Sequence, residues 1–141
     1  MKLSARNVLP GTVTKICKGA VNAEVQLSLK SGDNVVSIIT NASVDSLGLK
    51  EGQNAWAIIK ASWPILGKDL HNVKLSARNI FCGTVAKLVP GAVNTEVSLK
   101  LSQGTILTAI ITNESAHSLG FKEGDHACAA VKASSVILGV E

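Results

Sequence analysis

The chain has 141 residues, of which 46% are hydrophobic, and this length allows one ordinary domain or two very small ones. Its net charge is +4, but the Lys and Arg residues are spread singly and only 3% of the residues are aromatic. Nucleic-acid binding surfaces combine basic and aromatic side chains, so this composition favours a small anionic ligand over a nucleic acid.

Targeting and redox features point to a cytoplasmic protein with no membrane partner. No stretch approaches the roughly 20 consecutive apolar residues of a membrane-spanning helix, and the first residues lack the apolar core of a secretory signal. The three cysteines, Cys17, Cys82 and Cys128, show no Cys-x-x-Cys spacing, and none has a cysteine at the matching position of the repeat described next. This pattern predicts reduced, buried thiols.

The chain contains one internal repeat. A shift of 72 positions places Lys2 on Lys74 and aligns the two halves to the C-terminus without a gap, with more than half of the aligned residues identical. Such a period indicates a duplicated unit. We therefore predict two domains, 1–68 and 73–141, joined by a linker at about 69–72. Each unit is too small for a large core, so we expect oligomerisation.

The first repeat predicts five short strands and one short helix. Val25, Leu27 and Leu29 alternate with polar residues, which is the pattern of a half-buried strand. Asn41 is expected to cap the helix and Gly48 to end it. The expected strands are 11–16, 25–29, 35–40, 55–61 and 63–66, with a turn at 31–34 and the helix at 42–47. This order predicts an all-β chain of tandem OB-like Greek-key β-barrels, with one short helix in each repeat.

Four polar segments recur in both repeats: Ser-Ala-Arg-Asn, Gly-Ala-Val-Asn, Thr-Asn-x-Ser and Lys-Ala-Ser. They combine small side chains, which leave backbone N–H groups approachable, with hydroxyl, amide, guanidinium or ammonium donors. None of them contains Asp or Glu in both repeats. A tetrahedral oxyanion with two negative charges needs many donors, one or two cations and no carboxylate, so these segments are candidates for such a site.

Each segment also has a purely structural explanation. Ser4 could only cap the backbone at a strand start, and Lys60 could be the solvated end of a core strand. Gly19–Asn22 makes a sufficient hairpin turn without any ligand. Repetition shows that a unit was duplicated, and it does not separate folding requirements from binding.

Catalytic and cation-binding sites are disfavoured. None of His71, His117 and His126 has a histidine at the matching position of the other repeat. His126-Ala127-Cys128 places two potential metal ligands on one strand face, but its counterpart Asn54-Ala55-Trp56 offers none. Paired carboxylates at a recurring spacing and Gly-rich phosphate loops are also missing. We expect a protein that is not an enzyme and that has no cofactor and no cation site.

The recurring segments, together with Leu-Gly-x-Lys-Glu-Gly and a terminal Val-Ile-Leu-Gly, resemble the Mop family of molybdate-binding proteins in its two-repeat form. The resemblance covers nearly the whole chain. It implies an OB-like fold, six Mop units assembled in a ring-like oligomer, and therefore a homotrimer of this chain. It also implies binding of molybdate or tungstate between units, for intracellular molybdenum storage or buffering.

The same resemblance implies two classes of anion site. The first would combine the Ser-Ala-Arg and Lys-Ala segments of one unit with the helix serine of a neighbour: Ser4, Ala5, Arg6, Ser43, Lys60 and Ala61, and in the second repeat Ser76, Ala77, Arg78, Ser115, Lys132 and Ala133. The second class, near the symmetry axis, would use Gly19, Ala20, Val21, Asn22, Gly91, Ala92, Val93 and Asn94. Glu114 replaces Ala42 beside a proposed donor, which calls the equality of the two repeats' sites into question.

Two other functions stay open. By resemblance, the same domain serves as the sensor of molybdate-responsive regulators and as a part of molybdate-transport ATPases. The two units take up these 141 residues and leave no helix-turn-helix or Walker A segment among them, so we expect storage rather than regulation. An OB-fold nucleic-acid binder is supported only by the fold and the basic charge. The sequence does not choose between molybdate and tungstate.

Overall fold

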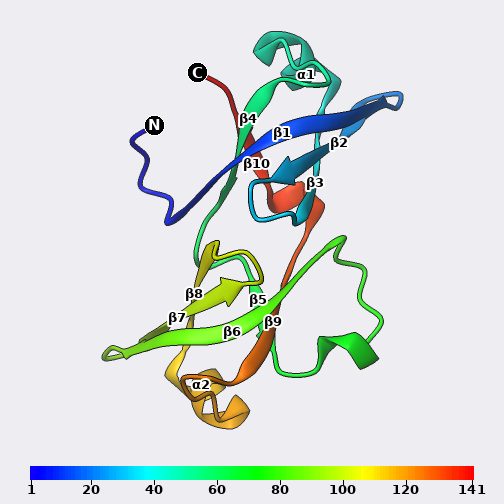
Figure 1. The fold of residues 1–141 in the computed structure, drawn as a ribbon. Coiled ribbons are helices and arrows are strands. Elements are labelled where there is room, and N and C mark those ends of the chain that lie inside the picture. Colours follow the sequence, from blue (N-terminus) through cyan, green and yellow to red (C-terminus); the bar gives the residue numbers. More distant parts are fainter.

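Ten β-strands and two short α-helices make up the structure, a computed structural model that describes all residues from 1 to 141 (Figure 1). The strands form two five-stranded sheets, one in each lobe. The first repeat contains β1 (Asn7–Lys18), β2 (Asn22–Leu29), β3 (Asn34–Thr40), α1 (Asn41–Leu47), β4 (Asn54–Ile59) and β5 (Ile65–Gly67). After the 3-10 turn η1 (Leu70–Asn72), the second contains β6 (Asn79–Pro90), β7 (Asn94–Leu101), β8 (Ile106–Thr112), α2 (Asn113–Leu119), β9 (His126–Val131), η2 (Ala133–Ser135) and β10 (Ile137–Gly139).

Alternating burial explains why these segments are strands. In β2, Ala23, Val25, Leu27 and Leu29 are buried, whereas the residues between them are partly exposed. The predicted all-β class, with tandem OB-like barrels and one short helix in each repeat, is confirmed. Neither helix is long and apolar enough to cross a membrane.

The first strand of each repeat bends so that it belongs to two strand pairs. β1 pairs with β4 along its first half and with β2 along its second half. The register against β2 shifts between Val13 and Lys15, which marks a β-bulge. β6 has the same shift between Val85 and Lys87. These bends curl each sheet.

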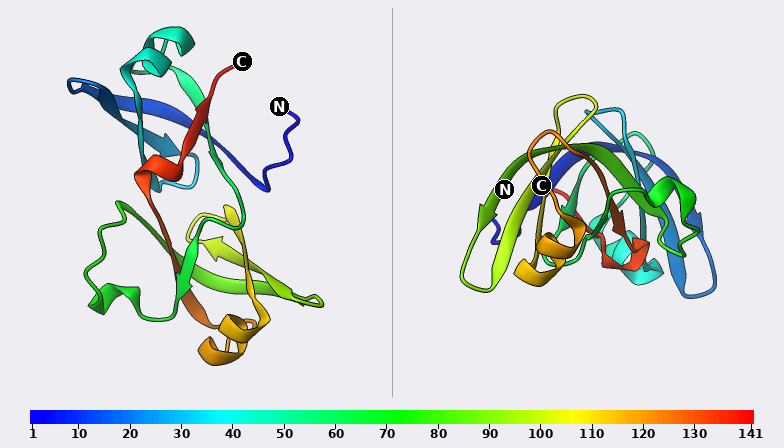
Figure 2. Two further views of the ribbon diagram at one scale, coloured as in Figure 1. Left: turned by 180° about the vertical axis from the view of Figure 1, so that it is seen from behind. Right: turned by 90° about the horizontal axis from the view of Figure 1, so that it is seen from below.

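The last strand of each repeat joins the sheet of the other repeat. β5 pairs with β9, and β10 pairs with β4. Figure 2 shows the two connecting segments running between the lobes. This differs from the expectation that each repeat supplies all five strands of its own barrel. Neither repeat therefore contains a complete sheet by itself.

Two buried asparagines fasten the lobes together. Asn7 Nδ2 donates to the Thr108 carbonyl at 2.7 Å, and Asn7 Oδ1 accepts from the Thr108 N–H at 2.8 Å. Asn79 makes the same two bonds to Val36, with the Val36 N–H donating at 2.7 Å and the carbonyl accepting at 2.8 Å. Thr108 and Val36 lie on β8 and β3, which are edge strands. Each asparagine therefore satisfies backbone groups on a free sheet edge of the other lobe.

A single apolar core of 26 buried residues extends through both lobes. Polar contacts also join the two repeats: Ser37 Oγ donates to the Val136 carbonyl at 2.7 Å, and the Ile110 N–H donates to the Ala61 carbonyl at 2.7 Å. Because the lobes share a core as well as strands, we infer that they form one cooperative unit.

The residue after β5 is anchored on the second lobe. Lys68 Nζ donates to the Gly120 carbonyl at 3.1 Å and lies 3.4 Å from the Asp125 carboxylate. The backbone N–H of Lys122 also donates to Asp125 and, together with Lys68, lowers the pKa of that carboxyl. These contacts hold the chain where it leaves the exchanged strand.

The helix cap differs from the prediction by one residue. Thr40 is the N-cap of α1, and its hydroxyl accepts from the Ser43 N–H at 3.0 Å. The prediction of Asn41 as the cap is wrong because its side chain donates instead to the Gly19 carbonyl. Gly48 ends the helix in the left-handed conformation (φ 61°), as predicted.

The prediction of reduced, buried thiols is wrong. Cys17 is exposed, and Cys82 and Cys128 form a disulfide. The two bonded cysteines are directly paired residues on the antiparallel strands β6 and β9. This pairing depends on the strand register, which cysteine spacing does not reveal.

We predict that Asn7→Ala lowers the free energy of unfolding by about 2–4 kcal/mol, because the Thr108 N–H and carbonyl are left without partners. Urea denaturation measures this effect, and Asn72→Ala, at an exposed position, is the control, with a change within about 0.5 kcal/mol.

Both tryptophans, Trp56 and Trp63, lie in the first repeat. Their fluorescence reports the unfolding of the first repeat, whereas far-ultraviolet circular dichroism reports the strands of both repeats. We predict that both signals follow one transition, and two separate transitions would contradict the shared core.

Candidate functional site

Two of the four recurring motifs meet at the end of each lobe that faces the other lobe. β1 and β4 are antiparallel, and Asn7 is paired with Ile59. Ser4–Arg6, just before Asn7, therefore leaves the sheet beside Lys60–Ala61, just after Ile59. The pairing of Asn79 with Val131 brings Ser76–Arg78 beside Lys132–Ala133 in the same way. We call these two pairs of segments the junction segments.

The arginines of the junction segments form ion pairs with the opposite repeat. Arg6 pairs with Glu96, and Arg78 pairs with Glu24 at 2.5 Å. The glutamate side chains are mostly buried, with exposed fractions of 24% and 27%. Because each carboxylate neutralises its arginine, neither guanidinium is a free cation for a ligand. The donors that remain are serine hydroxyls, backbone N–H groups and lysine ammonium groups.

The lysines of the junction segments carry positive charge that no carboxylate balances. Lys60 and Lys132 are exposed, directly follow β4 and β9, and take part in none of the five ion pairs of the structure. Lys60 Nζ lies 5.9 Å from the centroid of the Trp63 ring, near the outer limit of a cation–π contact. In the second repeat Ser135 takes the position of Trp63. Both lysines can therefore turn towards an anion.

The other two motifs meet at the outer end of each lobe. The exposed turn Gly19–Asn22 links β1 and β2, and Asn41 binds across it. Asn41 Nδ2 donates to the Gly19 carbonyl and the Asn41 N–H donates to the Val21 carbonyl, both at 2.9 Å. Asn113 binds Gly91 and Val93 in the same way in the second repeat. Gly-Ala-Val-Asn and Thr-Asn-x-Ser therefore share a structural role at each outer end.

The helix serines lie away from the junction segments of their own chain. Ser43 and Ser115 are in the first turns of α1 and α2, with hydroxyls 2.9 Å from the capping threonine hydroxyls. The two helices occupy opposite extremes of the molecule, whereas the junction segments face the middle (Figure 1). One chain therefore brings Ser4–Arg6 and Lys60–Ala61 together and leaves Ser43 apart from them.

The two outer ends differ in one partly buried hydrogen bond. In the second repeat, Thr95 Oγ1 donates to Asn113 Oδ1 at 2.6 Å. In the first repeat, Ala23 takes the place of Thr95, and Asn41 Oδ1 is buried without a partner. An unsatisfied acceptor does not suit an anion, so it is a structural defect of the first turn rather than part of an anion site.

The residues that hold the motifs in place were not among the predicted site residues, or were not predicted to have this role. Glu24 and Glu96 bind the motif arginines, while Asn7 and Asn79, the last residues of Ser-Ala-Arg-Asn, bind the opposite lobe. The available signal was that all four are identical between repeats. Repetition could not show that their partners lie in the other repeat.

The chain resembles known proteins over its whole length. The TOBE domain model matches residues 3–66 and 75–138. The solved structure of ModG, described as a cytoplasmic molybdate-binding protein with molybdate bound, is 48% identical, covers 100% of both chains and has a TM-score of 0.96.

Two longer relatives match almost all of the chain. MopA of Rhodobacter capsulatus, a molybdenum-pterin-binding protein, is 43% identical over 99% of it. ModE of Azotobacter vinelandii, a molybdenum transport protein, is 40% identical over 99% of it. The chain spans about half the length of these two proteins, 53% and 52% respectively.

We predict that Thr95→Ala lowers stability by about 1–2 kcal/mol, since it leaves Asn113 Oδ1 unsatisfied. The matched variant Ala23→Thr should raise stability by up to about 1 kcal/mol, because the new hydroxyl can donate to Asn41 Oδ1. Chemical denaturation of both variants measures the two effects. Equal destabilisation by both would show that the hydroxyl is not the reason for the difference between the repeats.

Proposed function

Because the chain belongs to the TOBE domain family, we propose that it binds molybdate, and tungstate as a close analogue, without transforming either anion. Binding is non-covalent and needs neither a cofactor nor catalysis. The role is storage or buffering of the anion in the cytoplasm. The similarity to ModG, described as a cytoplasmic protein and covering the whole chain, supports this proposal.

The observation that carries the proposal is the convergence of donors at the junction segments. Adjacent antiparallel strands bring the Ser4 hydroxyl and the backbone around Ala5 and Arg6 beside Lys60. Ser76, Ala77, Arg78 and Lys132 repeat this arrangement. The nearby carboxylates, Glu24 and Glu96, are already bound to arginines and do not repel an anion strongly. A lysine near hydroxyl and peptide donors suits a tetrahedral dianion.

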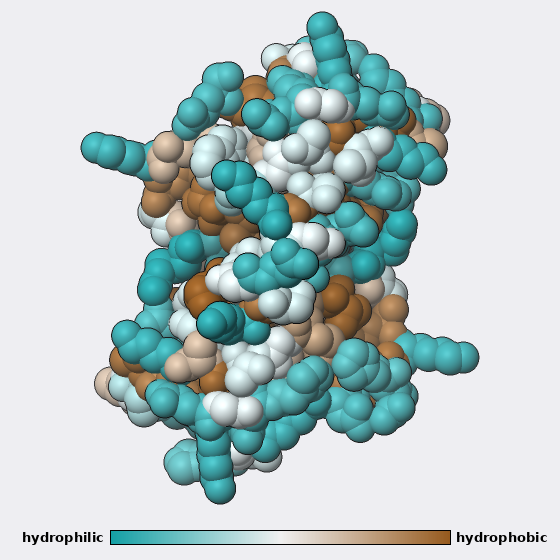
Figure 3. All heavy atoms as spheres, in the orientation of Figure 1, coloured by the Kyte–Doolittle hydropathy of each residue, from teal (hydrophilic) through white to brown (hydrophobic).

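In this proposal, a neighbouring chain completes each site. Ser43 and Ser115 point to such an arrangement because they lie far from the junction segments of their own chain. Apolar side chains near the junction segments, Leu3, Leu75, Ile65 and Ile137, are exposed and offer surface for an assembly to bury. Figure 3 shows hydrophobic areas around the boundary between the lobes. A homotrimer of two-repeat chains is the assembly that we propose.

The exposed turns Gly19–Asn22 and Gly91–Asn94 are proposed as a second class of anion site. Their small residues leave peptide groups accessible, and Val21 and Val93 project into solvent with 71% exposure each. In the trimer these turns would approach one another near the symmetry axis.

Storage is favoured over regulation in this proposal. Each α-helix of the structure has only seven residues, so the TOBE-matched segments contain no helix-turn-helix that could read DNA. A molybdate-sensing role would therefore need a DNA-binding part outside these segments.

We predict that Lys60→Met combined with Lys132→Met weakens molybdate binding by about 1.5–3 kcal/mol at each affected site, because a charge-assisted hydrogen bond is lost. The fold should persist, since both side chains are exposed. Titration calorimetry measures the loss, and Lys15→Met with Lys87→Met, which changes the net charge equally at exposed strand positions, is the control. If the folded Lys60/Lys132 variant bound molybdate with the affinity of the parent chain, neither lysine would contact the anion.

We also predict that phosphate competes with molybdate more weakly than sulfate does. Molybdate and sulfate are unprotonated at neutral pH, whereas much of the phosphate retains a proton that needs an acceptor. The nearby carboxylates, Glu24 and Glu96, are already bound to arginines. Competition calorimetry at constant ionic strength compares the two anions, and phosphate competition as strong as that of sulfate would refute a donor-only site.

A further inference from the structure

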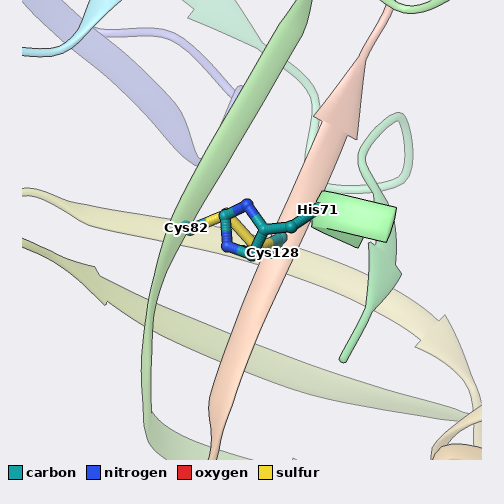
Figure 4. A group of neighbouring side chains, drawn as sticks. All are labelled: His71, Cys82 and Cys128. Carbon is teal, nitrogen blue, oxygen red and sulfur yellow. Dashed lines mark hydrogen bonds between the residues drawn. A yellow bond between two sulfur atoms is a disulfide. The ribbon is translucent and has the colours of Figure 1, made fainter. Parts of the chain in front are cut away.

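A group of metal-ligating side chains lies outside the junction segments, in the second lobe. Cys82 and Cys128 face each other on β6 and β9, and His71 reaches them from η1 (Figure 4). His71 Nε2 is 3.8 Å from Cys128 Sγ, and one ligand atom from each of the three residues lies within 4.8 Å of the others. Two of the three cysteines and a histidine of the chain therefore meet at one place.

A second histidine borders this group. His126 is two residues before Cys128 on β9, so its side chain emerges on the same face of the strand. Its ring centroid is 5.8 Å from that of His71. Two cysteines and two histidines are a common ligand set of tetrahedral zinc sites.

The first lobe shows that the fold does not require this group. Pro10, Asn54 and Trp56 take the positions of Cys82, His126 and Cys128, and they line an open cavity of about 600 Å³. η1 belongs to the linker, which occurs only once in the chain, and it brings His71 beside Cys128. The ligand set is therefore present only in the second lobe, where the linker supplies one of its members.

We propose that Cys82, Cys128 and His71, with His126 as the fourth ligand, bind Zn²⁺ when the disulfide is reduced. Reduction by a dithiol converts the disulfide into two thiols and the dithiol into its own disulfide, so two electrons and two protons are transferred. Zn²⁺ then replaces the two thiol protons, which are released to solvent. Exchange of the two thiolates with an oxidised dithiol transfers their two electrons to it, re-forms the Cys82–Cys128 disulfide and expels the ion, so the site exists only in a reducing environment.

One pair of ligand atoms already has the spacing of a zinc site. Zn–S bonds of about 2.3 Å and Zn–N bonds of about 2.0–2.1 Å place sulfur and nitrogen ligands about 3.6 Å apart in a tetrahedron. The 3.8 Å between His71 Nε2 and Cys128 Sγ is close to that separation. Cys128 is buried while His71 is exposed, so the ion would be shielded on the sheet side and reachable from the linker side.

The test uses the full chain with Cys17→Ser, which removes the exposed third thiol. The protein is reduced with a phosphine and titrated anaerobically with Co²⁺, whose thiolate charge-transfer absorption reports cysteine ligation. We expect one Co²⁺ per chain, displacement by Zn²⁺, and release of about two protons per ion. The oxidised chain should show no such absorption.

Matched variants identify the ligands. Cys82→Ser should abolish two-thiolate binding, and His71→Ala should weaken Co²⁺ binding by more than about tenfold, since even outer-shell partners contribute that much. His117→Ala, which removes the histidine on α2, should bind as the parent does. Circular dichroism checks that each variant is folded. The proposal would be overturned if the reduced, folded chain showed no thiolate absorption with Co²⁺, or if His71→Ala bound Co²⁺ with the affinity of the parent. Neither result bears on molybdate binding.

Discussion

The reciprocal exchange of β5 and β10 is the constraint on which the rest of the structure depends. Each three-residue strand completes the sheet of the other repeat, so the chain between β4 and β5, and between β9 and β10, must cross the boundary between the lobes. Lys60 and Lys132 lie at the start of these crossings, beside the segments that precede β1 and β6. The same exchange that unites the two lobes therefore also assembles the junction segments.

The recurring motifs divide their residues between folding and binding. In Ser-Ala-Arg-Asn, the arginine is bound to a glutamate of the other repeat and the asparagine to an edge strand of the other lobe. The serine, the small alanine and the neighbouring lysine have no comparable partner, so they remain available to a ligand. At the outer ends, Asn41 and Asn113 hold the turns, and the small residues of the turns stay exposed. A strictly repeated motif can thus reflect both requirements at once.

The sequence predicted the elements well because their signals are local. The alternation of apolar and polar residues predicts β2, and the glycine at position 48 predicts the end of α1. The repeat can be found because the aligned residues of the two halves are identical at many positions. The destination of the last strand could not be predicted, since Ile65–Gly67 and Ile137–Gly139 have the same sequence, Ile-Leu-Gly, and either could pair with β4 or β9. The Cys82–Cys128 pair and the Arg–Glu pairs likewise depend on register and on contacts between the repeats. Candidate site residues came from motif resemblance, and the geometry adds that the lysines are the free cations among them.

A crystal structure grown with tungstate would show where the anion binds, because the anomalous scattering of tungsten locates each anion without assumptions about its ligands. In the proposed arrangement, tungsten lies beside Lys60 and Lys132, in contact with the backbone around Ala5 and Ala77, and Ser43 or Ser115 of a neighbouring chain is in the same shell. Tungsten bound only at sites complete within one chain, or nowhere near the junction segments, would contradict it.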